Sequence, residues 1–584
     1  MGDLTTVAAY LTQRLEEMGL THVFAVPGDY TGELLTIIDT QSKLQRVACC
    51  NELNAAYAAD GYARYNGLAA LCVTSGVGAL SAINGVGGSY AEYHPVIVIV
   101  GTLSTSSGLK ESVGHRLFHH QLELRDTNLA VYRAVTAHQE SITNAGTAPA
   151  QIDAALTAAL VSRRPVLIEI SEDCCSLPCA ARSSPLSVPK RRYTDLATLR
   201  AIAPRNKHAA EIVESFDAAV AAIAAKWAAA KKPILWFGHE IATYGLRDEA
   251  ATLLETTRAP FVTSLLGKSV LGEARPGFLG VHEGVFTPPS CEEFLREGDL
   301  LVALGVWNTD INMLGVKSAR VANPADVLAV DDVVWVGEDT YFHVELGALL
   351  AELARRLAPR DWVARTAPRA FLHPRNLPPD APVTFDAFFG ALDVALDGKA
   401  KIVADIGISA NGASAWLRVD TPGAYQAQGI WASIGWSTPA GFGASFADDR
   451  RTFVIVGDGA FKLTCQELSS MARYRRDIVV FVMNNGVYGV EQMFLDPTPY
   501  RKDSTTPFEA ANVLQRWDYQ ALMAGLSGAD GAAARSAVIG VFGDLARVLG
   551  DIAASGPAAW LVEVRLAERD YPSAWNRIIY GDGH

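Results

Sequence analysis

The stretch 452–491 constrains the fold of this chain more than any other part of it. Two apolar, β-branched runs, 452–456 and 478–483, have the length and continuity of strands buried in a parallel sheet. Between them, 463–474 carries apolar residues at helical spacing, which predicts a helix. The stretch therefore predicts a strand–helix–strand unit of an α/β fold.

Both strand-like runs end at polar side chains. Asp458, within a Gly-Asp-Gly turn, follows the first run, and Asn485, the second of two adjacent asparagines, follows the second. In a parallel crossover unit these strand ends meet at one sheet edge, where open α/β sheets bind ligands. Two oxygen ligands beside a glycine turn suit a magnesium diphosphate, because Mg²⁺ prefers oxygen and glycine lets the backbone approach phosphates closely.

A Gly-Asp-Gly tripeptide alone is weak evidence, but here 24 residues separate it from an Asn-Asn pair. This combination resembles the thiamine diphosphate enzymes. Residues elsewhere narrow the resemblance to the 2-oxo acid decarboxylases of the pyruvate and indolepyruvate decarboxylase type. The resemblance covers nearly the full chain and implies pyrimidine-binding, central and diphosphate-binding domains, in that order.

Strand-like and helix-like segments alternate along the whole chain, which predicts three doubly wound α/β domains with parallel sheets. Pro-rich segments at 181–194 and 358–382 predict linkers. We therefore expect a pyrimidine-binding domain at 1–185, a central domain at 200–355 and a diphosphate-binding domain at 383–584. The expected strands are 22–26, 69–73, 96–100, 166–170, 234–237, 300–304, 327–330, 402–404, 452–456, 478–483 and 560–564.

Charge and cysteine content narrow the function classes. A net charge of −13 without an extended basic region argues against a nucleic-acid surface. Eight cysteines in 584 residues are too sparse for a disulfide framework and fit a reducing compartment. No apolar run approaches a membrane span, and no secretory leader is recognisable. We expect a cytoplasmic enzyme with a small-molecule substrate.

Glu52 begins a helix-like run of otherwise apolar and small residues. A carboxylate in such surroundings is costly unless it has a partner. From the local sequence, a helix-capping glutamate is equally compatible. The resemblance implies instead that Glu52 is catalytic and hydrogen-bonds the pyrimidine ring of the cofactor, which promotes its reactive tautomer.

Three further residues of the first domain suggest a proton relay. Asp29 follows a strand across a Pro-Gly turn, and His119 and His120 are adjacent. A histidine pair is more often a surface feature, and a metal site is disfavoured because neighbouring side chains do not normally face one point. The resemblance groups these three residues with Glu52, and imidazoles and carboxylates exchange protons near neutral pH.

Glu491 is the last residue of the stretch 452–491, and its simplest role is a solvated carboxylate on a helix. The resemblance places it over the thiazolium ring, near the carboxylate that leaves as carbon dioxide. It also implies that Ile434 props the cofactor in a bent form and that the Ala432 carbonyl accepts from the aminopyrimidine. The implied cofactor-binding residues are Glu52, Ile408, Ala432, Ile434, Asp458, Gly459, Ala460, Asn485 and Val490, and the implied metal ligands are Asp458, Asn485 and Val487.

The sequence departs from the family pattern at several of these positions. The Val487 carbonyl stands where glycine is usual, Ala460 where serine is frequent, and Ile408 where threonine or aspartate is common. A carbonyl ligand tolerates valine only if its backbone angles are ones that valine can adopt. The other two changes remove polar contacts, so diphosphate binding would depend more on backbone amides and a helix N-terminus.

The predicted substrate pocket also differs from that of pyruvate-restricted enzymes. Ala410 and Asn411 replace aromatic residues and Val490 replaces isoleucine, which opens space for larger substrate side chains. Phe494, in contrast, fills a position that is usually aliphatic. Our hypothesis is therefore a preference for branched or aromatic 2-oxo acids.

We predict a thiamine diphosphate- and Mg²⁺-dependent, non-oxidative 2-oxo acid decarboxylase. In this family each active site is shared between subunits, so the resemblance implies a homodimer at minimum and commonly a homotetramer. The alternatives are a carboligating enzyme of the acetolactate synthase type, a pyruvate-restricted decarboxylase and a non-catalytic cofactor-binding regulator. The last would be expected to lack Glu52, Asp458 or Asn485, all of which are present.

Overall fold

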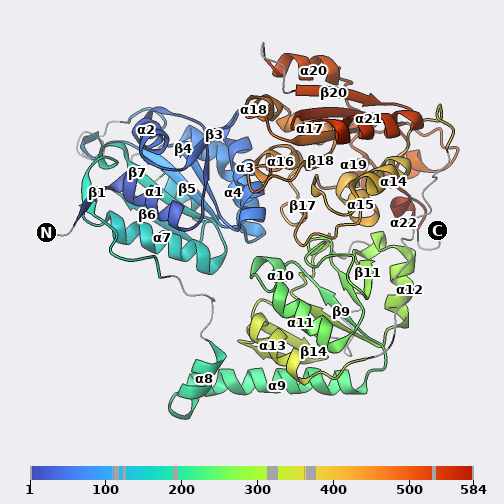
Figure 1. Ribbon diagram of the computed structural model, residues 1–584, viewed down its shortest axis with the longest axis horizontal. Helices are drawn as coiled ribbons and strands as arrows, with labels where there is room; N and C mark the ends of the chain where they lie inside the picture. Colours follow the sequence, from blue (N-terminus) through green and yellow to red (C-terminus); the bar gives the residue numbers. More distant parts are fainter. Residues whose placement is uncertain are drawn as a thin grey trace.

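Three α/β units make up the protein. Figure 1 shows them in blue to cyan, green to yellow, and orange to red along the sequence. The computed structural model describes residues 3–107, 110, 117–122, 127–187, 195–311, 327–360, 362, 377–528 and 534–581. Much of each predicted linker lies outside the described residues, namely 188–194 of the first and 361 and 363–376 of the second.

The N-terminal unit is built on a six-stranded parallel sheet of order β3-β2-β4-β5-β7-β6. Because helices cover both faces, the inner strands are almost continuously buried and apolar. The sheet contains β2 His22–Ala25, β3 Gln45–Ala48, β4 Ala69–Thr74, β5 Val96–Thr102, β6 His138–Ile142 and β7 Val166–Ser171. The helices are α1 Val7–Glu17, α2 Gly32–Gln41, α3 Glu52–Asn66, α4 Val77–Ala91, α6 Thr127–Tyr132 and α7 Ala148–Ser162, and β1 Leu4–Thr6 pairs with β8 Pro178–Ala180.

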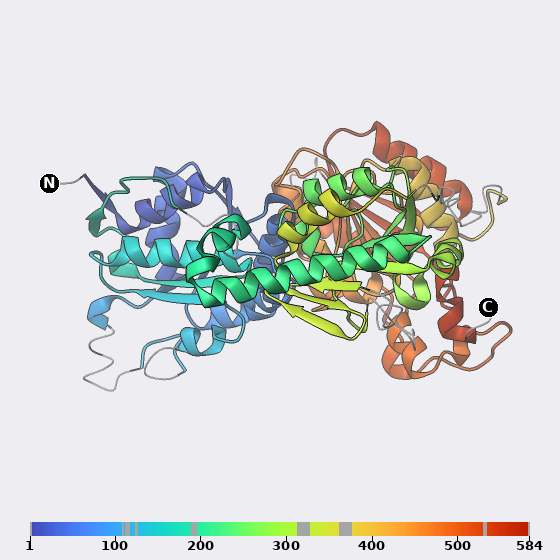
Figure 2. The same ribbon diagram turned by 90° about the horizontal axis from the view of Figure 1, so that it is seen from below.

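The central unit has a seven-stranded sheet of order β11-β10-β9-β12-β13-β14-β15. Its strands are β9 Pro233–Phe237, β10 Phe261–Thr263, β11 Phe278–Val281, β12 Leu300–Leu304, β13 Val327–Val330, β14 Val333–Val336 and β15 Asp339–Phe342. The last two are antiparallel to their neighbours. Its helices are α8 Leu196–Ile202, α9 Lys207–Ala229, α10 Glu240–Thr243, α11 Arg247–Thr257, α12 Pro289–Glu297 and α13 Leu346–Arg356. Figure 2 views the molecule from below and shows the long α9, in green, crossing the face turned toward the viewer.

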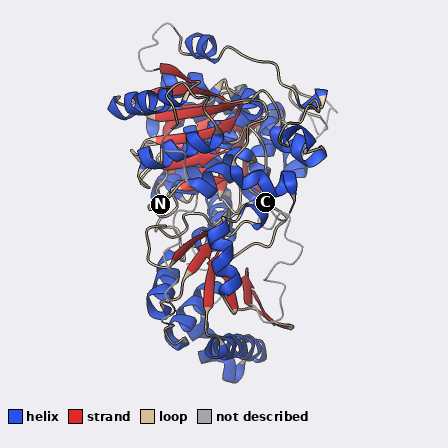
Figure 3. Ribbon diagram, turned by 90° about the vertical axis from the view of Figure 1, so that its right-hand side faces the viewer, coloured by secondary structure: helices blue, strands red, loops and turns tan. Residues whose placement is uncertain are grey.

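The C-terminal unit repeats the all-parallel plan in the order β17-β16-β18-β19-β21-β20. Its strands are β16 Lys401–Ala404, β17 Tyr425–Ala427, β18 Thr452–Gly457, β19 Ile478–Asn484, β20 Ala534–Ile539 and β21 Ala559–Arg565. Its helices are α14 Phe385–Leu396, α15 Ile408–Trp416, α16 Ser437–Ala444, α17 Asp458–Thr464, α18 Glu467–Arg473, α19 Gly489–Leu495, α20 Tyr519–Leu526, α21 Phe542–Ala554 and α22 Asn576–Tyr580. Figure 3 shows strands enclosed by helices in both the upper and the lower part of the molecule.

The predicted fold class is confirmed, and every strand expected from the sequence is present within one or two residues of its expected ends. The antiparallel hairpin of β14 and β15 is an addition to the expected parallel sheet. None of the helices in the described ranges combines the length and apolar character needed to cross a bilayer.

The single helix predicted at 463–474 is wrong. The chain enters α17 directly from β18, turns at 465–466 and continues as α18. The Thr464 hydroxyl donates to the Gly435 carbonyl (2.6 Å) at the end of α17. Beyond the turn, Glu467 accepts from the side chain of Asn54 in α3 (2.8 Å). These contacts with other segments favour the break over a continuous helix.

Candidate active site

One pocket, of about 250 Å³, lies at the carboxyl edge of the C-terminal sheet. The parallel pairing of β18 and β19, with Gly457 opposite Met483, brings the two polar strand ends together there. The pocket lining includes eleven of the residues singled out from the sequence: Ile408, Ala432, Ile434, Asp458, Gly459, Ala460, Asn485, Val487, Val490, Glu491 and Phe494. The predicted diphosphate side is therefore one continuous surface.

Asp458 and Asn485 have the properties expected of cation ligands. Asp458 is 3% exposed, and its carboxylate accepts from Gly486 N (2.9 Å) and Gly459 N (3.0 Å). Desolvation raises its pKa to about 6, although these amides oppose the shift. The charge of Lys462 also lowers the pKa of Asp458, but among the described residues no cationic side chain lies close enough to form a salt bridge with it. A buried carboxylate beside an amide oxygen, without a salt-bridge partner, fits a hard divalent ion.

The backbone at position 487 has angles that valine can adopt, as a carbonyl ligand from Val487 requires. Gly486 takes the left-handed conformation (φ 77°), whereas Val487 is not among the residues with positive φ. Valine is therefore unstrained where the third ligand carbonyl is expected. At Gly459, a Cβ would stand 2.2 Å from Cε1 of Tyr488, so the packing of this ring favours glycine here.

The loop carrying Ala432 is held in an unusual conformation by a buried glutamate. Ala432 has φ 54°, a region that non-glycine residues rarely adopt. Oε1 of Glu92 accepts from the backbone amides of Ile430 (2.7 Å) and Trp431 (3.2 Å). Glu92 itself is fully buried and paired with Arg64 (2.7 Å). This network fixes the peptide whose carbonyl is expected to meet the cofactor.

Glu92 and Asp405 are functional candidates that the sequence reading missed. Asp405 follows β16, is fully buried, and accepts from the amides of Gly435 (3.1 Å) and Ser437 (2.9 Å). Desolvation raises its pKa to about 6, although these donors oppose the shift. Asp405 could have been recognised from the sequence, because it is a carboxylate that directly follows an apolar strand. No local sequence pattern distinguishes Glu92.

Asp29, His119 and His120 form a cluster at the end of the N-terminal sheet. His119 Nε2 and Asp29 Oδ2 are hydrogen-bonded, and His120 Nδ1 lies 3.8 Å from Asp29 Oδ1. Desolvation would raise the pKa of Asp29, but the hydrogen bond from His119 and the charges of both histidines lower it overall. The three groups predicted to act together are thus in contact.

Glu52 is the first residue of α3. The Asn51 side chain caps this helix by accepting from Asn54 N (2.8 Å), and Cys50 N donates to Glu467 of the C-terminal unit (3.3 Å). A helix N-terminus favours a carboxylate. Neither Glu52 nor the Asp29 cluster belongs to the lining of the pocket around Asp458. A single chain therefore presents the predicted active site as two separate halves.

The expected substrate residues divide into two groups. Val490 and Phe494 line the pocket, whereas Ala410 and Asn411 are buried in α15 and do not belong to its lining. Phe494 also lies near Trp575 of the C-terminal segment, with ring centroids 6.3 Å apart. Of the four positions, only 490 and 494 thus border the cavity.

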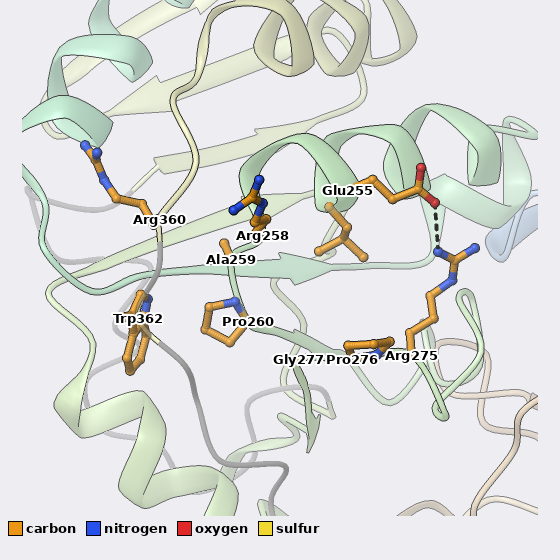
Figure 4. A pocket seen from close by; sticks show the side chains of 10 residues that line it. Glu255, Arg258, Ala259, Pro260, Arg275, Pro276, Gly277, Arg360 and Trp362 are labelled. Atoms are coloured by element: carbon orange, nitrogen blue, oxygen red, sulfur yellow. Dashed lines mark ion pairs between the residues drawn. The ribbon is translucent and has the colours of Figure 1, made fainter.

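A second cavity, of about 410 Å³, lies in the central unit beside Pro260, Pro276 and Trp362 (Figure 4). Its charged groups already have partners. Arg275 pairs with Glu255 (3.5 Å), and Arg360 donates to the Trp227 carbonyl (2.7 Å) at the end of α9. None of the predicted site residues lines this cavity.

Comparison with known families accounts for all three units. Residues 5–127 match the N-terminal thiamine pyrophosphate-binding domain of thiamine pyrophosphate enzymes, 220–346 match their central domain, and 405–564 match their C-terminal thiamine pyrophosphate-binding domain. The two matched cofactor-binding domains contain the two halves of the site described above.

Curated relatives agree over most of the chain. A probable pyruvate decarboxylase of Schizosaccharomyces pombe is 31% identical over 536 residues, which cover 90% of this chain and 88% of that protein. Pyruvate decarboxylase 1 of Oryza sativa subsp. japonica is 32% identical over 537 residues, with 90% and 83% covered. The chain therefore belongs to the thiamine pyrophosphate (thiamine diphosphate) enzyme family, within the group of 2-oxo acid decarboxylases that contains the pyruvate decarboxylases.

Proposed function

We propose that this protein converts 2-oxo acids to aldehydes and carbon dioxide, with Mg²⁺ as the metal that anchors thiamine diphosphate. The observation that carries the proposal is the single pocket containing both the oxygen ligands Asp458 and Asn485 and the acidic side chain of Glu491. Relatives named as pyruvate decarboxylases support the same reaction class.

Different side chains of this protein would bind the cofactor and transfer protons. When bound, thiamine diphosphate supplies the electron sink that decarboxylation requires. Asp458, Asn485 and the Val487 carbonyl would hold Mg²⁺ and the diphosphate. Glu52 would hold the pyrimidine ring in its reactive tautomer by a hydrogen bond.

The remaining acid–base groups would act on the substrate side of the site. Glu491, exposed at the pocket rim, would orient the substrate carboxylate. The cluster of Asp29, His119 and His120 would deliver the proton that completes the aldehyde, because imidazoles exchange protons near neutral pH.

The two halves of the site require a second copy of the chain. Glu52 stands outside the pocket of its own chain, and Val77, Trp431 and Ile434 expose large apolar side chains beside the two halves. A twofold dimer would cover these side chains and would place Glu52 of one protomer over the Asp458 pocket of its partner. We infer a homodimer as the minimum active unit and a homotetramer as its common assembly.

The proposed substrates are branched or aromatic 2-oxo acids. Val490 lines the pocket where the related enzymes commonly have isoleucine, and Phe494 adds an aromatic side chain to the lining. All eight cysteines are unpaired, which supports a reducing compartment such as the cytoplasm.

The test is aldehyde and carbon dioxide release from pyruvate, 4-methyl-2-oxopentanoate and phenylpyruvate, with and without thiamine diphosphate and Mg²⁺. Cofactor-dependent aldehyde formation, with a higher kcat/KM for the larger acids, is the expected result. A clear preference for pyruvate would overturn the substrate proposal. Acetohydroxy acid products would favour a carboligating enzyme, and cofactor binding without turnover would favour a regulator.

A further inference from the structure

Asp29, His119 and His120 form a cluster of metal-donor groups separate from the oxygen ligands around Asp458. One ligand atom from each side chain lies within 4.8 Å of the other two. Two imidazoles and a carboxylate are a donor set that borderline transition cations prefer. Magnesium, in contrast, favours oxygen ligands and keeps much of its water.

The backbone at His120 explains how adjacent histidines can serve one ion, against the expectation from sequence. His120 adopts φ 66°, in the left-handed region. Its carbonyl packs so tightly on Gly76 that a Cβ there would stand 1.8 Å from the carbonyl oxygen. The two imidazole rings consequently lie at 81° to each other with centroids 4.8 Å apart, and both reach Asp29.

Neighbouring side chains hold the donors in place. The Tyr30 ring stacks on His119, with centroids 5.0 Å apart and planes 15° apart, and the Tyr30 hydroxyl donates to the His119 carbonyl (3.2 Å). The Thr74 hydroxyl donates to Asp29 Oδ1 (3.4 Å). Such supporting contacts orient metal ligands and reduce the cost of organising them around an ion.

One donor atom lacks a partner. Nδ1 of His120 is buried and forms no hydrogen bond with any described residue, although it lies 3.8 Å from Asp29 Oδ1. In a single chain the side chains of His119, Asp29 and His120 are nevertheless 59%, 46% and 29% exposed, so the described part of the same chain does not close the cluster to an ion. A cation between the rings and the carboxylate would satisfy His120 Nδ1.

We propose that Asp29, His119 and His120 bind one Zn²⁺-class divalent cation, and that this cation inhibits the enzyme. Coordination would displace any proton bound at the ligand nitrogens into solvent and occupy their lone pairs. The coordinated nitrogens, His119 Nε2 and His120 Nδ1, could then no longer accept or deliver protons. The inhibition rests on the proposed function, whereas the binding does not.

The test is calorimetric titration of Zn²⁺ into the enzyme loaded with thiamine diphosphate and excess Mg²⁺. All proteins carry Cys50→Ser, which removes the exposed thiol. We expect one site per chain that millimolar Mg²⁺ does not displace, and at least roughly tenfold weaker binding in His119→Gln and in His120→Gln. Co²⁺ in place of Zn²⁺ should give visible absorption bands that both variants lose.

His138→Gln is the matched control, because it removes an imidazole that is paired with a carboxylate (Glu140, 2.8 Å) but has no third metal donor beside it in the part of the chain that the structure describes. It should bind Zn²⁺ like the parent, and melting temperatures should verify that all variants are folded. Equal Zn²⁺ affinity in the parent, His119→Gln and His120→Gln would overturn the proposal. The absence of a Zn²⁺ site in the parent would overturn it as well. Binding without loss of decarboxylation in the parent would overturn the inhibitory part alone.

Discussion

At the scale of single residues, Glu52 offers the most direct test of the catalytic assignment. It begins α3, with the preceding loop tied to Glu467, so its position does not depend on its own charge. Glu52→Gln keeps the size of the side chain but removes its acidity. We expect kcat to fall at least about 100-fold, the range of a lost acid–base group, with an unchanged melting temperature.

Near-normal turnover in Glu52→Gln would remove this residue from the mechanism. Glu33→Gln is the matched control, because Glu33 is an exposed carboxylate in the first turn of the neighbouring α2. It makes the same change in net charge and should leave kcat unchanged.

Glu92 should matter through the loop that it holds. Glu92→Gln removes the charge that pairs with buried Arg64 and weakens the acceptor for the amides of Ile430 and Trp431. Arg64 keeps a second buried partner, Asp60 (2.8 Å), so we expect the loss of unfolding free energy to stay below the roughly 3–5 kcal/mol that leaving a buried charge unpaired typically costs. We also expect thiamine diphosphate to bind at least roughly tenfold more weakly, a change of about 1.4 kcal/mol, measured by titration of the apoprotein.

An unchanged cofactor affinity in Glu92→Gln, whatever its stability, would show that the Ala432 loop does not need this anchor. The same residue illustrates a limit of sequence reasoning. Asp458 and Asn485 could be found because they end strands that lie side by side. Glu92 acts on a loop more than 300 residues later in the chain, a contact that no local pattern encodes.

At the scale of elements, α15 connects the pocket to the central unit. Its first residue, Ile408, lines the pocket, and Ser414 near its end donates to Glu283, which follows β11. Glu283 is fully buried, and desolvation raises its pKa to about 8 despite the hydrogen bond from Ser414. Nearby Lys268 is already bound to Glu273 (2.7 Å). A buried hydrogen bond between Ser414 and Glu283 therefore joins the two units.

This arrangement makes stability depend on pH with a definite sign. The folded-state pKa of Glu283 lies above the ordinary value of 4.5, so the folded protein binds a proton that the unfolded chain releases. The associated stability is present below pH 4.5 and is lost as pH rises toward 8. Each pH unit in that window costs up to about 1.4 kcal/mol.

Glu283→Gln mimics the neutral acid and cannot ionise. We expect its melting temperature, relative to the unmodified protein, to increase steadily between pH 6 and pH 8. A difference that does not vary with pH would contradict a proton on Glu283. Glu33→Gln again controls for net charge, since Glu33 is exposed in both states.

Elements were more predictable from the sequence than their ends and breaks. Buried parallel strands appear as continuous apolar runs, so β12 and β13 were expected at their observed bounds. The division of 463–474 between α17 and α18 was not predictable. The residues around the turn form hydrogen bonds with Gly435, Cys50 and Asn54, which lie in distant segments of the chain. The spacing of apolar residues within one segment carries no information about such long-range contacts.

At the scale of the whole molecule, the separation of Glu52 from the Asp458 pocket determines how activity depends on assembly. α3 packs on α16 within one chain, as Figure 1 shows, and Glu52 remains outside its own pocket. If each site combines the N-terminal unit of one protomer with the C-terminal unit of another, Glu52 and Asp458 of one chain serve different sites. Two inactive variants could then complement each other.

Co-expression of Glu52→Gln with Asp458→Ala, on differently tagged chains, tests this arrangement. In a mixed dimer both substitutions fall in the same site, so the other site contains only unaltered residues. Random pairing makes about half of the dimers mixed and leaves one working site in each, which predicts about a quarter of wild-type activity. Isolated mixed dimers should reach about half of it. Activity no higher than that of either variant alone would mean that each chain completes its own site, and the proposed dimeric active unit would be wrong.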